Sequence, residues 1–347
     1  MTTVYSLSQL GWSAFFQQQL NLDECEHATP ARVLAQHRNR LALCTPAGGC
    51  ELPCSTHLPE VTVGDWLLLG RDGTFLRRLE RTTRLARKAP GSAVSEQLIA
   101  ANVDTLFVVT ALNRDFSLNR IERYLALCRQ AGATPVVLLT KSDLCTQVDD
   151  YIERVQALDP LLAVMALDSR CAEVRAHLAP WCQPGQTLAL LGSSGVGKST
   201  LSNTLLETQT QETAQARALD DKGRHTTTSR SLHVLPSGAL LLDTPGMREL
   251  QLGACERGVE QTFAELSALA AQCRFADCGH LNEPGCALLQ AQRAGELEPR
   301  RLESYLKLQR EQARNGATLA QQRARDKAQS RYYRSVQDAS RSRKKGQ

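Results

Sequence analysis

Long apolar segments are missing from this sequence. No apolar run reaches roughly 18 residues, so no membrane-spanning helix is predicted and we expect no membrane contact. The first residues, Met-Thr-Thr-Val-Tyr-Ser, lack a basic segment followed by an apolar one, so we also expect no signal peptide. No internal repeat or low-complexity stretch is apparent.

Cysteine, in contrast, is frequent, with 12 in 347 residues. Without a secretion signal, this number indicates reduced thiols in a cytoplasmic protein rather than disulfide bonds. The length suggests two to three domains. A hydrophobic content of 42% is sufficient for ordinary buried cores.

A complete phosphate-binding loop (P-loop) lies in the second half of the chain. It reads Gly-Ser-Ser-Gly-Val-Gly-Lys-Ser, follows the apolar run from Thr187 to Leu191, and precedes a helical pattern. In this context backbone N–H groups cradle phosphates, and the helix N-terminus adds a favourable partial charge. Lys198 is expected to reach the β- and γ-phosphates, and Ser199 to hold Mg²⁺. The predicted nucleotide contacts here are Gly192, Ser193, Ser194, Gly195, Val196, Gly197, Lys198, Ser199 and Thr200.

A base-recognition element lies upstream of this loop. The apolar run Pro135–Leu139 ends in Thr140, Lys141, Ser142 and Asp143, which together we call the guanine motif. An aspartate can accept hydrogen bonds from guanine N1–H and from its exocyclic amine, and a lysine stem can lie along the base. GTPases usually carry Asn where Thr140 stands, so guanine affinity is expected to be lower. Without the P-loop, the tetrapeptide would read equally well as a turn with a helix cap.

Two further elements follow the P-loop. Gly223–Thr228, with the sequence Gly-Arg-His-Thr-Thr-Thr, lies in a polar stretch where a switch loop is expected, and Thr227 is predicted to complete the Mg²⁺ shell. The strand pattern Ala239–Leu242 ends in Asp-Thr-Pro-Gly. There Asp243 is expected to contact the metal through water, and Gly246 to meet the γ-phosphate.

The order of these elements differs from that of a standard GTPase, which begins with the P-loop and ends with the guanine motif. A circular permutation explains the difference, because the termini of compact domains often lie close together. The chain leaving the Asp243 loop then runs directly into the C-terminal part, so nucleotide state could move that part.

Three cysteines and one histidine cluster within fourteen positions near the C-terminus. Their composition is that of a structural zinc site, with one ion per chain held by Cys273, Cys278, His280 and Cys286. The alternative is a set of buried free thiols beside a surface histidine. Cys50, Cys54 and His57 form a looser trio without a nearby fourth ligand, so no metal is predicted there.

The N-terminal part reads as a separate module. A short amphipathic helix is predicted over residues 6–19, with Leu7, Leu10, Ala14 and Phe15 on one side. Short alternating strands from Ala31 to about Arg81 suggest a five-stranded OB barrel, a fold that commonly binds oligonucleotides. Arg84–Ser95 reads as a linker. Positive charge on the barrel is expected from Arg32, Arg38, Arg40, Arg77 and Arg78.

The C-terminus carries an excess of positive charge. Residues 300–347 contain 14 Lys/Arg and 4 Asp/Glu, whereas the preceding residues contain 27 and 32. Such a segment can contact nucleic-acid phosphates, and Tyr332 and Tyr333 could stack on bases. The alternative is a solvated helix and a frayed end. The stretch Glu296–Arg331 has a helix-forming composition.

Together these motifs resemble the RsgA (YjeQ) family of circularly permuted GTPases. The matching features are the guanine motif, the P-loop, the switch loop, Asp-Thr-Pro-Gly and the Cys/His cluster. The stretches Glu96–Asp104 and Asn119–Tyr124 match as well. The resemblance spans roughly residues 30 to 315. It implies binding to the small ribosomal subunit and its rRNA during late subunit maturation. The departures are Thr140 and a weak element around Asp168, where GTPases usually carry a Ser-Ala pair behind the guanine carbonyl.

The catalytic residue is the least defined part of the site. Met247 follows Gly246 at the place where Ras-type enzymes orient water with a glutamine, and an apolar side chain cannot do this. Intrinsic hydrolysis is therefore expected to be slow. His225 in the switch loop is the best alternative for positioning the water, unless it is merely exposed there.

The sequence therefore predicts a multidomain fold: an OB-type β-barrel, a circularly permuted α/β P-loop GTPase domain and a helical zinc domain. The predicted parts are an N-terminal extension 1–30, an OB-fold 31–85, a GTPase domain 95–250, a zinc-binding domain 251–315 and a basic tail 316–347. We expect a monomeric GTPase whose hydrolysis is stimulated by the small subunit. Two alternatives are an RNA-binding scaffold with a structural nucleotide and a P-loop kinase acting on a small molecule.

Overall fold

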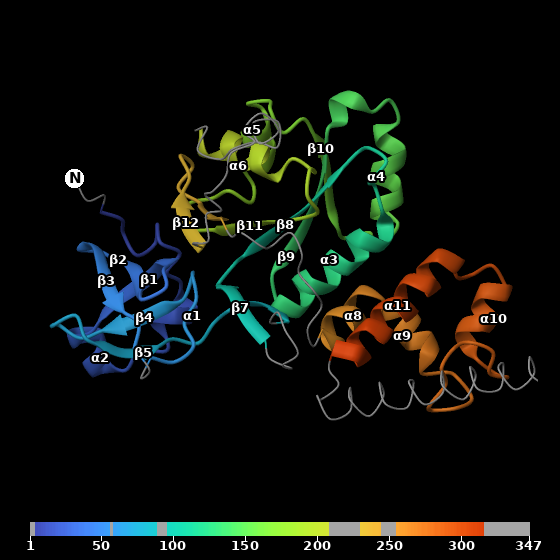
Figure 1. Cartoon of the computed structure of the whole chain (residues 1–347), viewed down its shortest axis with the longest axis horizontal. Coiled ribbons are helices and arrows are strands. Elements are labelled where there is room, and N and C mark those ends of the chain that lie inside the picture. The colour runs from blue at the N-terminus through green and yellow to red at the C-terminus, as the bar shows by residue number, and fades with distance from the viewer. Residues whose placement is uncertain (1–3, 56–57, 89–95, 208–229, 244–254, 316–347) are drawn as a thin grey trace, which may run out of the picture.

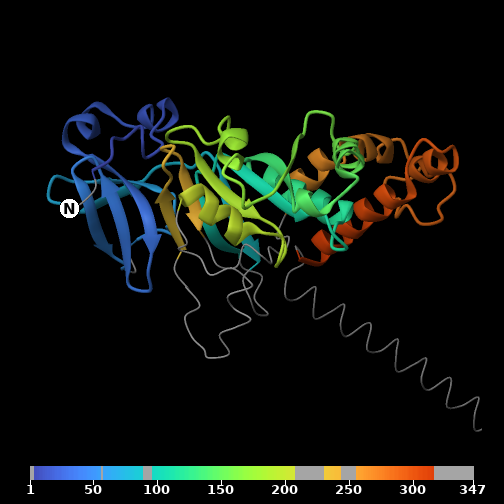
Figure 2. The same ribbon diagram turned by 90° about the horizontal axis from the view of Figure 1, so that it is seen from above.

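Three parts lie side by side along the long axis of the molecule (Figures 1 and 2). They are an N-terminal barrel, a central sheet with helices on both faces, and a group of C-terminal helices. The computed structural model describes residues 4–55, 58–88, 96–207, 230–243 and 255–315. Among the helices of these ranges, none combines the length and the apolar character that crossing a bilayer requires.

The barrel is built from five antiparallel strands of the OB type. They are β1 (Thr29–Gln36), β2 (Arg40–Thr45), β3 (Gly48–Pro53), β4 (Trp66–Leu69) and β5 (Phe75–Arg78). β1 pairs with both β2 and β4, β2 with β3, and β4 with β5. All four residues of β4 are buried rather than alternating, because Leu67 and Leu69 face the barrel core while Trp66 and Leu68 face the N-terminal segment.

The N-terminal segment covers one side of this barrel. Its helices are short, α1 (Ala14–Gln17) and α2 (Leu22–His27), so the prediction of one helix over residues 6–19 was wrong. Gly11, with φ of +85°, interrupts the helical pattern. The buried side chains are Leu10 and Phe16, whereas Ala14 is exposed.

The central sheet has the strand order β10-β9-β8-β11-β13-β12. These strands are β8 (Thr105–Ala111), β9 (Thr134–Thr140), β10 (Ala163–Leu167), β11 (Thr187–Leu191), β12 (Arg230–Val234) and β13 (Leu240–Asp243). All neighbours are parallel except the β12–β13 pair. The carboxyl ends of the parallel strands therefore meet at one edge, where α/β proteins bind ligands.

Helices cover both faces of the sheet. α3 (Leu118–Ala131) and α4 (Val148–Gln156) pack on one face, and α5 (Val174–Leu178) and α6 (Lys198–Leu206) on the other. Alternate residues of β8 divide between the two layers, because successive side chains of a strand point to opposite faces. Leu106 and Val108 pack toward α3, and Phe107 and Val109 toward α6.

The barrel and the central sheet are joined into one continuous sheet. The end of β1 pairs antiparallel with the start of β12, with Ala35 opposite Ser231 and Gln36 opposite Arg230. Arg32, only 1% exposed, strengthens the junction by donating hydrogen bonds to Leu10 O, Asn102 O and the Thr187 hydroxyl. Burial lowers the pKa of Arg32 to about 10.

The expected basic surface of the barrel is correspondingly reduced. Arg32 is buried and cannot contact RNA, so its assignment to that surface was wrong. Arg77 is held by Glu24, and Arg40 forms an ion pair with Glu51. Arg38 remains exposed in the turn that follows β1.

The predicted linker begins as a strand. β6 (Arg84–Lys88) pairs with β7 (Glu96–Ala101) in a separate two-stranded sheet, so only 89–95 can serve as a connection, and these lie outside the described residues. Apolar residues at Leu85 and Leu98 bury this hairpin against the main core. A reading from local composition missed the pairing, because β6 is short and rich in charged residues and its partner β7 lies beyond 89–95.

The C-terminal helices pack against α3 rather than against the sheet (Figure 1). They are α8 (Glu256–Thr262), α9 (Ala264–Ala270), α10 (Ala287–Arg293) and α11 (Pro299–Asn315). Gly258 of α8 approaches so closely that an added Cβ would lie 2.0 Å from the carbonyl oxygen of Ala126 in α3. α11 occupies the first half of the predicted helical stretch, and residues 316–347 lie outside the described ranges.

Candidate nucleotide site and metal centre

The P-loop connects β11 to α6 at the carboxyl edge of the sheet. Gly192 has φ of +151°, and a Cβ there would lie 2.2 Å from the carbonyl oxygen of Val109. Gly197, with φ of +98°, caps the start of α6. The loop therefore fits tightly against β8 and leads directly into the N-terminus of α6. The first N–H groups of a helix have no carbonyl partner within the helix.

Lys198 folds back over its own loop. Its ammonium group donates to the carbonyl oxygens of Gly192 at 2.7 Å and Ser193 at 2.5 Å. Ser199 and Thr200 follow in the first turn of α6, where both are half-buried. This places the cation and the hydroxyls of the motif around one short loop, as phosphate and magnesium binding require.

The guanine motif lies two strands away, at the end of β9. Lys141 adopts the left-handed conformation with φ of +60°, and Ser142–Leu144 form the 3₁₀ helix η1. Thr140 is fully buried, and its hydroxyl lies 2.6 Å from the carbonyl oxygen of Val196 in the P-loop. This hydroxyl joins the two motifs to each other.

Asp143 forms an ion pair with Arg170, which lies in the loop that follows the neighbouring strand β10. The Nη2 atom of Arg170 lies 2.8 Å from Oδ2 of Asp143 and 2.8 Å from Oδ2 of Asp168. The hydrogen bonds from Arg170 lower the pKa of Asp168 to about 2. Asp168 follows β10, so the weak sequence element around it does lie beside the guanine motif.

Ser193 of the P-loop is contacted from α3. The Nη1 atom of Arg120 lies 2.9 Å from the Ser193 hydroxyl. The hydroxyl of Tyr124, a buried residue whose pKa is raised by burial, also bonds Ser193. Neither Arg120 nor Arg170 was predicted as a site residue. Their positions depend on tertiary pairing of strands and helices. Arg120 lies in the stretch Asn119–Tyr124 that matches the family, a signal that could have found it, whereas no predicted motif includes Arg170.

Of the remaining predicted contacts, Asp243 lies within the described residues and the others lie outside them. Asp243 ends β13, beside β11, at the same edge of the sheet. His225 and Thr227 of the switch loop lie outside the described residues, as do Gly246 and Met247. The structure thus brings together the guanine motif, the P-loop and Asp243.

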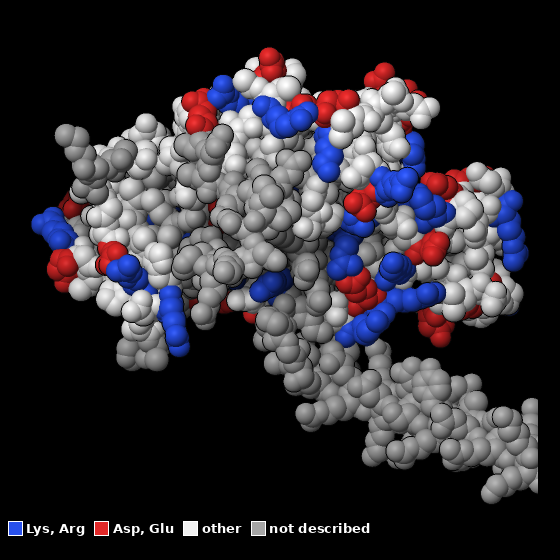
Figure 3. Space-filling view, turned by 45° about the horizontal axis from the view of Figure 1, so that its top comes forward, with Lys and Arg blue, Asp and Glu red and all other residues white. Residues whose placement is uncertain are grey.

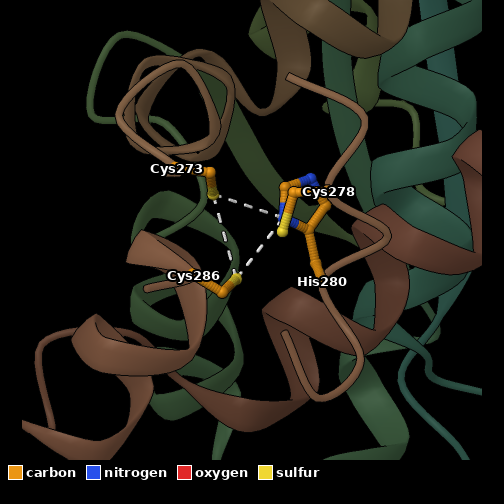
Figure 4. A group of neighbouring side chains, drawn as sticks. All are labelled: Cys273, Cys278, His280 and Cys286. Atoms are coloured by element: carbon orange, nitrogen blue, oxygen red, sulfur yellow. Dashed lines mark hydrogen bonds between the residues drawn. The ribbon is translucent and has the colours of Figure 1, made fainter. Parts of the chain in front are cut away.

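The four predicted zinc ligands converge between α9 and α10 (Figure 4). Their ligand atoms all lie within 4.8 Å of one another. The Cys273 and Cys286 sulfurs are 3.9 Å apart, and Nδ1 of His280 lies 3.6 Å and 3.5 Å from them. Bond lengths of roughly 2.3 Å to sulfur and 2.0–2.1 Å to nitrogen give tetrahedral edges of about 3.5–3.8 Å, so the cluster fits a zinc ion.

The chain around the cluster is shaped to present these ligands. His280 has φ of +56°, and the Glu283 carboxylate accepts backbone N–H groups of Gly279, Leu281 and Asn282. The Ala287 N–H points at the Cys273 sulfur. Burial lowers the pKa of His280, which favours the neutral imidazole that a metal requires.

Comparison with known proteins decides the family. The RsgA GTPase family model matches residues 78–253. The chain is 53% identical to the small ribosomal subunit biogenesis GTPase RsgA 2 of Vibrio parahaemolyticus, over 99% of this chain and 96% of the relative. The chain belongs to the RsgA GTPase family. It is therefore a GTPase, which hydrolyses GTP to GDP and phosphate.

Other relatives and solved structures agree. The protein of the same name from Vibrio vulnificus is 54% identical, over 96% of this chain and 95% of the relative. The crystal structure of YjeQ from Thermotoga maritima matches with a TM-score of 0.60 at 22% identity, covering 82% of this chain and 99% of that one. The structure of YloQ, described as a circularly permuted GTPase, matches with a TM-score of 0.58 at 23% identity, covering 83% and 96%. The permuted fold is thereby confirmed.

Proposed function

We propose that this RsgA-family GTPase acts on the small ribosomal subunit in the cytoplasm, binding rRNA and assisting late maturation as a monomer. The names of relatives that cover nearly the whole chain, small ribosomal subunit biogenesis GTPases, support the small subunit as partner. Binding of GTP is supported above all by the convergence of the P-loop, the guanine motif and Asp243 at one edge of the sheet.

In this proposal each side chain has one task. The P-loop N–H groups and Lys198 bind the phosphates, and Asp143 accepts hydrogen bonds from the guanine edge. Ser199, Thr227 and Asp243 would hold Mg²⁺, which when bound offsets the negative charge of the phosphates. Water attacks the γ-phosphate in line, and His225 positions this water because Met247 has no polar atom able to do so.

The zinc ion is proposed to be structural. The cluster of Cys273, Cys278, His280 and Cys286 leaves no open position for a substrate. Its role is to hold α9 and α10 together. The surface that these helices present, and the basic tail beyond α11, would then contact rRNA.

A phosphate-release assay tests the proposal. Turnover with GTP is expected to be slow for the protein alone and to rise when purified small subunits are added. Lys198→Ala and Ser199→Ala should abolish the stimulated turnover while leaving the circular dichroism spectrum unchanged, because both side chains contact ligand rather than core. Equal turnover with and without subunits would overturn the proposed stimulation.

A further inference from the structure

The guanine motif of this chain lacks one donor. GTPases usually carry an asparagine at the position of Thr140, and an amide has two N–H donors where a hydroxyl has one. Thr140 is 0% exposed, and its hydroxyl has only carbonyl oxygens as partners, Val196 at 2.6 Å and Thr110 at 3.2 Å. Its single proton is therefore used inside the protein, and none is available for a base.

A cationic donor lies next to Asp143 instead. Arg170 is held by Asp168 through three side-chain contacts, from Nε at 2.9 and 3.2 Å and from Nη2 at 2.8 Å. Its Nη2 also reaches Asp143, as described above. Within the described part of the chain, Nη1 of Arg170 has no hydrogen-bond partner, and the side chain is 67% exposed. The guanidinium is thus tethered at one end and open at the other.

The loop that carries Arg170 is firmly placed. The carbonyl oxygen of Ser169 accepts a 2.6 Å hydrogen bond from the Thr204 hydroxyl of α6. Ser169 is also buried, close to Gly197 of the P-loop. Arg170 therefore projects from a segment fixed to the same helix that begins the phosphate site.

We propose that Arg170 is a base-recognition residue that donates hydrogen bonds to the O6 carbonyl of guanine. This rests on the proposed role of Asp143 in accepting N1–H and the exocyclic amine. O6 is adjacent to N1 on the same edge of the base, so a donor beside the Asp143 oxygen that accepts N1–H would lie within reach of O6. As the base enters, Asp143 exchanges its bond from Arg170 for bonds from guanine, while Asp168 keeps the guanidinium in place.

The same arrangement discriminates against adenine. Adenine carries an amino group at position 6, which would direct its N–H donors at a cation that has no acceptor. Its unprotonated N1 would meet the Asp143 carboxylate. A mismatch of this kind leaves polar groups unpaired and costs more than the loss of a favourable contact.

Binding of modified diphosphates tests the assignment. The probes are GDP, inosine diphosphate, which lacks the 2-amine, and 6-thioguanosine diphosphate, in which a weakly accepting sulfur replaces O6. Arg170→Met should weaken GDP binding about tenfold or more, the range of a charge-assisted hydrogen bond. In the wild type, 6-thioguanosine diphosphate and inosine diphosphate should each bind more weakly than GDP. In Arg170→Met the ratio of affinities for GDP and the 6-thio nucleotide should fall to within about twofold, while the ratio for GDP and inosine diphosphate stays unchanged.

The control is Arg175→Met, which removes an exposed arginine of α5 paired with Glu207 and should change none of these affinities. Arg170→Lys should recover part of the GDP affinity. Arg170→Met that binds GDP as tightly as wild type, or keeps the full 6-thio penalty, would overturn the proposal. If wild-type protein binds inosine diphosphate as tightly as GDP, Asp143 does not accept a bond from the 2-amine, and the role of Arg170 beside it is overturned as well. Subunit-stimulated hydrolysis is a separate measurement and would not be affected by this result.

Discussion

Asp143 carries the proposed choice of base. Its side chain is 30% exposed, so it is accessible to a ligand while its backbone is fixed by η1. Replacement by asparagine removes the charge that strengthens two hydrogen bonds to guanine, at a cost of about 1.5–3 kcal/mol. Asp143→Asn is expected to lose its preference for GTP over ATP in a competition assay. An unchanged preference would remove Asp143 from the base pocket.

Glu24 makes the barrel sensitive to acid. Its carboxylate accepts hydrogen bonds from Arg77 and from the Asn21 N–H, and these lower its pKa from 4.5 to about 2. The folded state therefore favours the ionised form. The resulting stabilisation is fully present above about pH 4.5 and is lost as the pH falls toward 2.

We therefore predict that the difference in stability between wild type and Glu24→Gln shrinks with falling pH. Urea unfolding followed by tryptophan fluorescence measures this difference. Trp12 of the N-terminal segment packs against Trp66 of the barrel, so both side chains report on this interface. The difference should be largest near neutral pH, fall steadily below about pH 4.5 and become small only near pH 2. A constant difference over that range would show that Glu24 acts through shape alone.

Among the elements, α3 joins the nucleotide site to the C-terminal helices. One of its sides reaches Ser193 through Arg120, as described for the P-loop. Another carries Glu122, which is 0% exposed and accepts hydrogen bonds from Arg300 at 3.0 Å and Arg301 at 2.9 Å, both on α11. Arg123 adds a bidentate pair with Glu311 of α11 at 2.7 Å. The contact is therefore charged at its centre and directional.

Glu122→Gln tests how much this contact stabilises the protein. Removing the charge takes a fully buried carboxylate from two partly buried arginines, which keep their exposed partners Glu298 and Glu265. We expect this to cost about 3 kcal/mol of the free energy of unfolding. Glu51→Gln is the matched control, since its pair with Arg40 is exposed and should contribute less than about 1 kcal/mol. Urea unfolding by circular dichroism compares them. Similar small losses in both variants would contradict a structural role for Glu122.

Zinc should hold α9 and α10 together. We predict one zinc per chain by elemental analysis, released by chelator or acid because thiolates bind metal only when deprotonated. Cys286→Ser should release the metal and make the C-terminal helices susceptible to proteolysis, whereas Cys25→Ser, at an exposed site outside the cluster, should not. Protein purified without chelator that contains no metal would refute the assignment.

The sequence predicted best those elements whose chemistry is local. The P-loop and the Cys/His cluster each depend on residues close together in the chain, and the structure brings each set together as expected. It predicted poorly what depends on distant partners. Arg32 looked like a surface cation because nothing local indicates the carbonyl groups it meets, and β6 looked like a linker because its partner strand lies beyond 89–95.

At the scale of the whole molecule, charge is unevenly distributed. On the face shown in Figure 3, Lys and Arg side chains gather over the half that contains α3 and the C-terminal helices, with acidic side chains among them. The chain continues from α11 into the basic tail. The end that would approach rRNA is thus the end that carries the positive charge.

Subunit binding is therefore expected to weaken steeply with salt. Deleting residues 316–347 should flatten this dependence and reduce stimulated hydrolysis, while GTP binding stays unchanged because the guanine motif and P-loop lie elsewhere. Sedimentation with small subunits over a range of salt concentrations measures it. A tail-deleted protein with unchanged affinity, salt dependence and turnover would leave the tail without this role. The basic residues removed are Arg323, Arg325, Lys327, Arg331, Arg334, Arg341, Arg343, Lys344 and Lys345.

The pairing of β1 with β12 has a consequence for how the protein is made. During synthesis β1 leaves the ribosome long before β12. β4 covers the first half of the edge of β1 that β12 joins, but the end of the strand, at Ala35 and Gln36, lacks its partner until residues 230–234 arrive. Exposed edges recruit other strands and promote aggregation. A stalled chain that ends before β12 would therefore depend on chaperones more than the finished protein does. The end of β1 gains its partner only when β12, at the edge of the GTPase sheet, has been made.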